Sequence, residues 1–287
     1  MAYLRKATLP PRNTAPIGIF DSGVGGLTVL HELHRQLPDE SILYVGDTAR
    51  LPYGDRTPDE ILQFVREIIA WMMAQGVKMV MMACNTSSAL ALEQVQAEFP
   101  LPILGLIYPG ARAAAKAGQR IGVIATPATV ASDAYRQAIL EVDSTKQVWQ
   151  VGCPQFVPLI EQNRLHDPET IRVAKTYLQP LLAAEIDTLI YGCTHYPHLA
   201  PVFQTCLPNT IQRIDPARSM VQAAAKELEL LNLKSGTLSR PTEFFVSGCP
   251  DQFSQLAARW LGSVPQVHQV NFTAFATVRK SNISAGT

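Results

Sequence analysis

The sequence predicts an α/β protein, because short apolar segments alternate along the chain with the periodic pattern of amphipathic helices. The apolar segments are continuous, which is typical of parallel strands that helices cover on both faces. A chain of 287 residues is long enough for about two domains and for a core that needs no metal or disulfide. We therefore expect mostly parallel sheets in two domains.

The first expected strand covers residues 17–20 and ends in the glycine-rich turn 21–26. A helical pattern follows over residues 27–37, and a second apolar strand is expected over residues 42–45. The turn matches no nucleotide-binding loop, because Thr28 stands where the dinucleotide pattern has glycine or alanine and no Gly-Lys-Ser/Thr is present. Its amides can hold a carboxylate, but the motif taken alone favours a plain strand–helix turn.

Residues 57–60, Thr-Pro-Asp-Glu, form a capping box and predict a helix that ends at Gly76. A third buried strand is expected over residues 78–83, and Cys84 lies where this strand gives way to another helix. We expect the helix dipole and free amides to lower the pKa of this thiol. Residues 85–86 can cap the helix and bind a ligand, although a buried structural cysteine is an equally good interpretation.

The most specific segment is 192–197, Gly-Cys-Thr-His-Tyr-Pro, which follows another apolar run. It carries the thiol of Cys193 and the imidazole of His195 on one turn, and such an imidazole can favour a thiolate or pass a proton onward. The alternative is a core cysteine beside a turn histidine. Glu161, at the end of an apolar segment, is by itself typical of a solvated helix residue. The remaining cysteines are expected to be structural: Cys153, Cys206 and Cys249.

A weak internal repeat relates the two halves of the chain. Residues 17–20 resemble residues 121–124, and each run ends in a polar turn. Cys84 and Cys193 follow apolar strands at 66 and 71 positions after the glycine of the repeated run. Any two α/β segments share such strand patterns, but the matched cysteines favour a duplication. Because ligands bind at the carboxyl ends of parallel strands, two facing halves would bring two thiols to opposite sides of one molecule.

The composition excludes several classes of protein. The 24 basic and 24 acidic residues cancel, so a nucleic-acid coat is not expected. The longest apolar region, residues 68–84, is interrupted by polar residues and is too broken to span a bilayer. No secretory signal is evident, and five cysteines do not make a disulfide framework. We expect a cytoplasmic protein with no nucleic-acid or membrane partner.

No metal or cofactor is expected. The sequence has no Cys-x-x-Cys pair. The zincin motif is His-Glu-x-x-His, and the stretch that begins at His31 does not match it, because Arg35 stands where the motif has its second histidine. No lysine lies in the polar turns described above, which argues weakly against pyridoxal phosphate.

Four motifs occur in order at appropriate separations: residues 21–26, 52–54, 84–86 and 192–197. Together they resemble the cofactor-independent aspartate/glutamate racemase superfamily and, within it, the glutamate racemases. The resemblance covers most of the chain, over residues 17–261. It implies two pseudo-symmetric α/β domains with the active site in the cleft between them.

The resemblance also implies the activity, the interconversion of L- and D-glutamate that supplies D-glutamate for bacterial peptidoglycan. By resemblance, Cys84 is the base for D-glutamate and Cys193 the base for L-glutamate. Asp21 would assist the first thiol, and His195 and Glu161 the second. The implied substrate-binding residues are Asp21, Ser22, Tyr53, Gly54, Asn85, Thr86, Thr194 and His195.

For the domain organisation we expect a discontinuous first domain, made of residues 17–108 and 218–270. The second domain would comprise residues 109–217, and residues 1–16 and 275–287 would be loose tails. Since members of the family often pair, a homodimer is expected.

Three residues depart from the family pattern. Ser87 stands where alanine is usual, His198 where leucine is common, and Tyr108 where many relatives have an acidic residue. None of them replaces an expected base or ligand.

Three other functions stay open on the sequence alone. An aspartate racemase would use the same chemistry with a shorter side-chain pocket. A non-catalytic module could close two lobes on an acidic amino acid. A thiol redox protein would form a disulfide between Cys84 and Cys193, whereas two bases that flank a substrate should stand too far apart to bridge.

Overall fold

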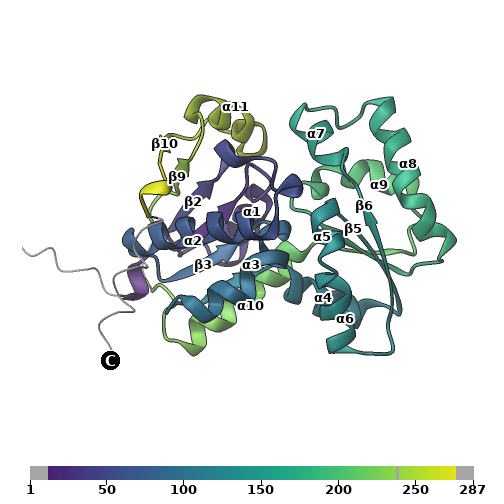
Figure 1. Cartoon of the computed structure of the whole chain (residues 1–287), viewed down its shortest axis with the longest axis horizontal. Coiled ribbons are helices and arrows are strands. Elements are labelled where there is room, and N and C mark those ends of the chain that lie inside the picture. The colour runs from purple at the N-terminus through teal and green to yellow at the C-terminus, as the bar shows by residue number, and fades with distance from the viewer. Residues whose placement is uncertain (1–11, 237–238, 276–287) are drawn as a thin grey trace, which may run out of the picture.

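The computed structural model describes residues 12–236 and 239–275 and has two lobes, each built on a parallel sheet (Figure 1). The predicted α/β class with mostly parallel sheets is confirmed. Most of the expected loose tails, residues 1–16 and 275–287, lies outside the described residues.

The first lobe contains a six-stranded parallel sheet. Its strands are β1 (Ile17–Asp21), β2 (Ile42–Gly46), β3 (Met79–Met82), β4 (Ile103–Gly105), β9 (Glu243–Val246) and β10 (Val267–Gln269). Its helices are α1 (Leu27–Gln36), α2 (Pro58–Ala74), α3 (Asn85–Glu98), α10 (Pro216–Leu230) and α11 (Pro250–Leu261). Its 3-10 helices are η1 (Arg12–Thr14), η2 (Thr48–Arg50), η3 (Tyr53–Asp55) and η5 (Thr273–Phe275). The strand order is β10-β9-β2-β1-β3-β4. Helices α1, α10 and α11 pack on one face of this sheet, and α2 and α3 pack on the other.

The second lobe contains a four-stranded parallel sheet. Its strands are β5 (Arg120–Ala125), β6 (Gln147–Gly152), β7 (Thr188–Gly192) and β8 (Gln212–Ile214). Its helices are α4 (Ile107–Ala117), α5 (Pro127–Ala131), α6 (Ala134–Val142), α7 (Phe156–Glu161), α8 (Pro168–Ala183), α9 (Ala200–Cys206) and the 3-10 helix η4 (Tyr196–Leu199). The chain leaves the first sheet after β4 and returns to it at β9, with all four strands of the second sheet in between.

The two sheets repeat one strand order, because β2-β1-β3-β4 in the first corresponds to β6-β5-β7-β8 in the second. Gly18 in β1 and Gly122 in β5 occupy equivalent positions. A Cβ at Gly18 would lie 3.0 Å from Met72 Sδ of α2, and a Cβ at Gly122 would lie 3.2 Å from Leu181 Cδ1 of α8. In both lobes the absent side chain thus lets the helix that precedes the cysteine-bearing strand approach the sheet closely.

The capping box predicted at the start of α2 is confirmed. The Thr57 side chain accepts a hydrogen bond from the backbone N–H of Glu60, and the Thr57 N–H donates to Glu60 Oε2 at 2.9 Å. The helix ends at Ala74, and Gly76 has a φ of +77°, the left-handed conformation that favours glycine after a helix. These local signals place β3 directly after α2.

Residues 12–16 belong to the folded lobe and are not a loose tail. Arg12–Thr14 form η1, and Ala15 is buried. The reason is the buried ammonium of Lys78, which donates to the carbonyl oxygens of Asn13 at 2.7 Å and Leu233 at 2.8 Å. A buried ammonium requires such partners, so it holds this segment against the sheet.

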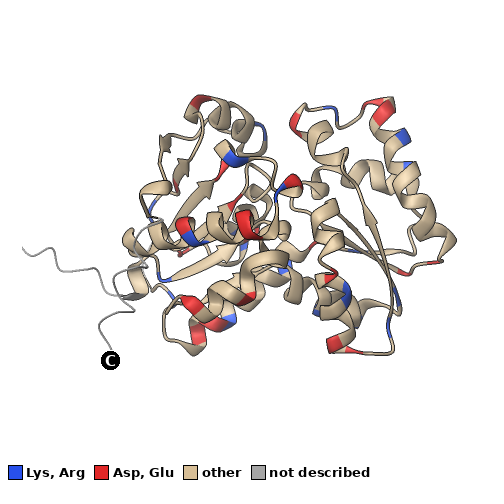
Figure 2. Ribbon diagram, in the orientation of Figure 1, with Lys and Arg blue, Asp and Glu red and all other residues tan. Residues whose placement is uncertain are grey.

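Charged residues of both signs are interspersed over both lobes (Figure 2). Among the described residues, none of the helices has the length and apolar character needed to cross a membrane.

Candidate active site

A cavity of about 360 Å³ lies between the lobes at the carboxyl ends of their strands. Its walls bring together every residue that the sequence and the family resemblance suggested for catalysis or binding. These residues are Asp21, Ser22, Tyr53, Gly54, Cys84, Asn85, Thr86, Glu161, Cys193, Thr194 and His195. The volume is in the range of small-molecule sites.

Cys84 reaches the cavity from the first lobe. It directly precedes α3, is 5% exposed, and its thiol lies 3.9 Å from Ser22 Oγ. Burial, and after it the nearby carboxylate of Asp21, raises the pKa of Cys84 to about 12. The expectation of a lowered pKa was wrong, because the loss of solvation outweighs the effect of the helix N-terminus.

Asp21 ends β1 and has two different oxygens. Its Oδ2 accepts hydrogen bonds from the backbone N–H groups of Gly23 and Gly26, each at 3.0 Å. Its Oδ1 is buried and has no partner among the described residues. Burial raises the pKa of this carboxyl, although His195 and the backbone N–H groups counteract the rise. One oxygen therefore holds the turn while the other stays available beside Cys84.

Cys193 reaches the same cavity from the second lobe, directly after β7. Its thiol lies 3.7 Å from His195 Nδ1, and His195 Nε2 lies 3.3 Å from Glu161 Oε1. Burial by itself would lower the pKa of His195, but the hydrogen bonds with Cys193 and Glu161 outweigh it and raise this pKa to about 10. His195 is therefore an imidazolium near neutral pH, in line between a thiol and a carboxylate.

The turn between β1 and α1 packs directly against this group. A Cβ at Gly25 would lie 2.6 Å from His195 Cε1 and 2.7 Å from Thr194 Oγ1, so any side chain there would collide with the other lobe. Thr28 Oγ1 also donates to the Thr194 carbonyl at 3.3 Å. The glycine-rich motif thus serves close contact between the lobes, which its sequence alone did not reveal.

The polar groups of the cavity suit an amphoteric ligand. Helices α3 and α5 begin at its wall, and Thr86 Oγ1 of α3 lies 3.0 Å from Thr126 Oγ1, the N-cap of α5. Free N–H groups at helix N-termini attract carboxylates. The described residues that line the cavity include no lysine or arginine, while Asp21, Asp55 and Glu161 supply acidic groups for an ammonium.

Tyr53 lines the cavity, but its hydroxyl already has a partner within the protein. The Tyr53 hydroxyl donates to the Asp47 carboxylate, and burial followed by Asp47 raises the pKa of this phenol well above its ordinary value. A Cβ at Gly54 would lie 3.7 Å from Thr126 Cβ, so this part of the first lobe closely faces α5.

Sequence reasoning missed several residues that line the cavity, two of which carry a hydroxyl or a thiol. Thr126 and Cys153 both line the cavity, and Cys153, expected to be structural, is fully buried there with its thiol 3.5 Å from the Val151 carbonyl oxygen. The missed signal was the pair Gly152-Cys153 at the end of β6, which repeats the Gly-Cys pair at the end of β7. The other two unassigned cysteines do not line this cavity, and all five thiols are free: Cys84, Cys153, Cys193, Cys206 and Cys249.

The three departures from the family pattern have different environments. Ser87 is fully buried and its hydroxyl donates to the Cys84 carbonyl at 3.1 Å, close to the first thiol. His198 stacks on Trp260 of the other lobe. Tyr108 is 42% exposed on α4 and lines no part of the cavity.

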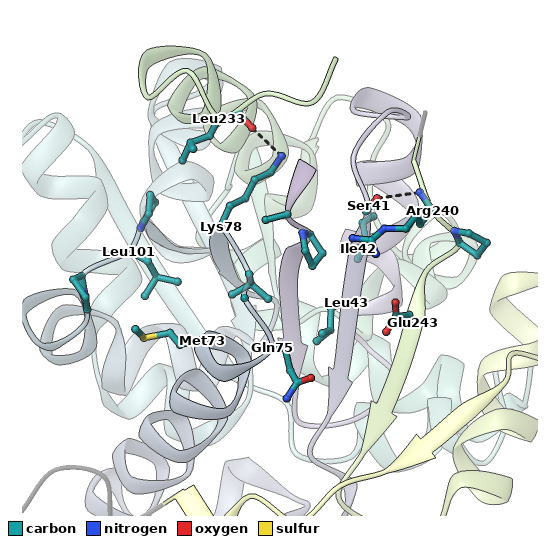
Figure 3. Close-up of a pocket in the computed structure, with 17 residues that line it drawn as sticks. Ser41, Ile42, Leu43, Met73, Gln75, Lys78, Leu101, Leu233, Arg240 and Glu243 are labelled. Carbon is teal, nitrogen blue, oxygen red and sulfur yellow. Dashed lines mark hydrogen bonds between the residues drawn. The ribbon is translucent and has the colours of Figure 1, made fainter. Parts of the chain in front are cut away.

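A larger cavity of about 560 Å³ lies at the opposite, amino-terminal edge of the first sheet (Figure 3). The Lys78 ammonium at its wall is satisfied by three groups of the protein, including Glu40 Oε2 at 2.5 Å, and Arg240 N donates to Ser41 Oγ. None of its lining residues belongs to the cysteine motifs. Among the described residues, no group of three or more His, Cys, Asp or Glu side chains is placed to hold a metal ion.

Comparisons with known proteins agree on one family. The Asp/Glu/Hydantoin racemase family matches residues 17–224. A glutamate racemase of Gloeothece citriformis is 68% identical over 256 residues, which cover 89% of this chain and 92% of that protein. The crystal structure of a glutamate racemase isoform from Bacillus anthracis superposes with a TM-score of 0.88 at 37% identity, over 90% of this chain and 98% of that one. A Francisella tularensis glutamate racemase in complex with D-glutamate gives a TM-score of 0.86 at 33% identity, over 91% and 99% of the two chains.

Proposed function

The chain belongs to the Asp/Glu/Hydantoin racemase family of isomerases and groups there with the glutamate racemases, and from this premise we propose that it interconverts L- and D-glutamate through two cysteine bases. The observation that carries the proposal is that Cys84 and Cys193 line one cavity from two lobes. They follow β3 and β7, which are equivalent strands of the repeated order.

Two bases account for inversion at Cα, because a single fixed base returns the proton to the face it came from. In the L-to-D direction the Cys193 thiolate removes the Cα proton, and the electron pair of that C–H bond stays on the carbon. The carbanion then takes the proton of the Cys84 thiol on its opposite face. In the D-to-L direction the two cysteines exchange roles, so the reaction consumes no other reactant.

The electrostatics of the cavity support this assignment. With a pKa of about 12, Cys84 is a thiol near neutral pH and is ready to donate. The His195 imidazolium, with a pKa of about 10, stabilises a negative charge on the adjacent Cys193. The resting enzyme is then prepared for L-glutamate. Turnover leaves Cys84 as the thiolate, and Asp21 and His195 help to return the protons to their starting positions.

Binding and carbanion stabilisation fall to neutral donors. We assign the two substrate carboxylates to the α3 N-terminus and to the side chains of Asn85, Thr86 and Thr194. Fixed N–H and O–H groups of this kind need no reorganisation during the reaction. Placement between two lobes excludes water and holds both thiols near Cα.

Glutamate is favoured over aspartate as the substrate because curated relatives at 61–68% identity are named glutamate racemase. We further propose that the protein acts in the cytoplasm as a homodimer and supplies D-glutamate for peptidoglycan. Analytical ultracentrifugation tests the dimer. Depletion of the protein in its host, with rescue by external D-glutamate, tests the role in the cell wall.

The direct test is to incubate the reduced protein with L-glutamate in deuterium oxide, without added metal or pyridoxal phosphate, and to follow the Cα proton by NMR. The proposal expects loss of this signal together with formation of D-glutamate. An unchanged signal from folded protein would overturn it, and a parallel incubation with L-aspartate would then separate the aspartate racemase from the binding module.

Single cysteine variants test the two-base mechanism. Cys84→Ala and Cys193→Ala are each expected to abolish racemisation, whereas Cys206→Ala, outside the cavity, is expected to keep it. Full racemisation by both active-site variants would exclude the mechanism.

A further inference from the structure

The side-chain amide of Asn85 has one satisfied and one unsatisfied end. Asn85 is the first residue of α3, is 3% exposed and lines the cavity beside Cys84. Its Oδ1 accepts a hydrogen bond of 2.6 Å from the hydroxyl of Tyr135. Its Nδ2 is buried and has no partner among the described residues. This nitrogen is therefore the end of the amide that is left for a ligand.

Tyr135 belongs to the other lobe and packs in the core of that lobe. It lies on α6 and is fully buried. Its ring edges face two glycines, so that a Cβ at Gly192 would lie 3.1 Å from Tyr135 Cε2 and a Cβ at Gly110 3.4 Å from Tyr135 Cε1. Gly192 directly precedes Cys193, so the Tyr135 ring packs beside the backbone next to the second thiol. The hydroxyl of the same ring reaches Asn85, which directly follows the first thiol.

The Tyr135 hydroxyl is a permanent donor. Burial, followed by the negative charges of Asp215 and Cys193, raises its pKa well above the ordinary value, so it stays protonated through the working range of pH. A side-chain amide can occupy two orientations that exchange its oxygen and its nitrogen. The hydroxyl can also accept, but Asn85 Oδ1 is the acceptor that its own proton has among the described residues, so the orientation with the oxygen towards Tyr135 is the one that satisfies this proton.

We propose that Tyr135 is a positioning residue, which acts across the lobe interface to hold the Asn85 amide with its N–H groups towards a substrate carboxylate. The inference rests on the proposed function, because the carboxylate is that of the glutamate. It also links binding to the arrangement of the lobes, since the hydroxyl meets Asn85 only when the two lobes are together.

Removal of the hydroxyl alone tests the proposal. Tyr135→Phe keeps the ring against both glycines and is expected to raise KM for both enantiomers by about five- to tenfold, the size of one hydrogen bond, with kcat changed less than about twofold. The matched control is Tyr191→Phe. The Tyr191 hydroxyl is also buried but has no partner among the described residues, so its loss is expected to leave KM unchanged.

A double-mutant cycle separates positioning from a general structural effect. Once Asn85 is replaced by alanine, Tyr135→Phe is expected to add no further rise in KM. Asn85→Asp keeps an acceptor for Tyr135 but lacks the N–H groups, so it is expected to show the raised KM with the tyrosine bond intact. Equal effects of Tyr135→Phe in the presence and absence of Asn85, or an equal effect of Tyr191→Phe, would overturn the proposal.

An NMR measurement makes the test independent of turnover. With 15N-labelled asparagine, the Asn85 side-chain amide signal is assigned by its loss in Asn85→Ala. This signal is expected to shift or broaden in Tyr135→Phe and to stay in place in Tyr191→Phe. An unchanged signal in Tyr135→Phe would refute the positioning role even in an active enzyme. If the wild-type protein does not turn over glutamate, the proposed function fails, while this signal still reports on Tyr135.

Discussion

The imidazole of His198 stacks on the indole of Trp260, with ring centroids 4.0 Å apart and ring planes 22° apart. His198 lies in η4 of the second lobe and Trp260 in α11 of the first, so the stack joins the lobes next to the active site. The His195 ring also meets Trp260 edge-on at 6.2 Å. A residue that departs from the family pattern thus makes a contact between the lobes beside the imidazolium that faces Cys193.

This stack predicts a pH dependence of stability. Burial, and after it the positive His195, lowers the pKa of His198 to about 4, so the folded protein favours the neutral ring. In the unfolded chain an ordinary histidine has a pKa of about 6.5. The contribution of His198 is therefore present above pH 6.5 and is lost as the pH falls towards 4.

We expect His198→Leu to lose less stability than the wild type between pH 7 and pH 5, measured as the free energy of unfolding in urea. His31→Leu, at an exposed position on α1, is the control and should keep the wild-type slope. Identical slopes for wild type and His198→Leu would contradict the prediction.

Glu161→Gln is expected to move the alkaline limb of the activity profile. The Glu161 carboxylate helps to raise the pKa of His195 to about 10, so the imidazolium beside Cys193 persists well above neutral pH. An amide of the same shape removes the charge and is expected to lower this limit by about one pH unit. The measurement is kcat/KM from pH 6 to 11. An alkaline limb at the same pH as in the wild type would show that Glu161 does not control the protonation of His195.

Asp21→Asn is expected to lower the pKa of Cys84. The Asp21 carboxylate is, after burial, the main cause of its rise to about 12. The rate of alkylation by iodoacetamide against pH, in a protein whose other cysteines are replaced, should shift to lower pH. The control is Asp55→Asn, which removes another carboxylate of the same cavity without shifting the curve. Equal curves for Asp21→Asn and wild type would show that burial alone sets the reactivity of the thiol.

Gly25→Ala is expected to reduce kcat/KM by more than about 100-fold, because the new Cβ would lie 2.6 Å from His195 Cε1 and must displace the imidazole or separate the lobes. The cost in unfolding free energy should stay near about 1–3 kcal/mol, as for a typical overpacked site. Gly236→Ala is the control, since nothing lies within 4 Å of its Cβ. Wild-type activity of Gly25→Ala would mean that the two lobes do not need this close contact.

Local chemistry allowed much of the site to be predicted. The capping box at Thr57, the buried strands and the polar residues after them are encoded within a few positions of the chain. The repeated placement of Cys84 and Cys193 after apolar strands even indicated that both thiols would serve one ligand. Glu161 could not be judged in this way, because its partner His195 is 34 positions away in the sequence.

The sequence by itself therefore determined the α/β class, the parallel strands and which polar motifs end them, because periodicity and turn chemistry are local. Only the tertiary structure decided the pKa of Cys84 and the partners across the cavity. The pKa of Cys84 rises instead of falling, Cys153 joins the cavity wall, and Asn85 is oriented by Tyr135. Desolvation and electrostatic fields depend on every atom that surrounds a group, and here those atoms come from two lobes that meet only when the chain is folded.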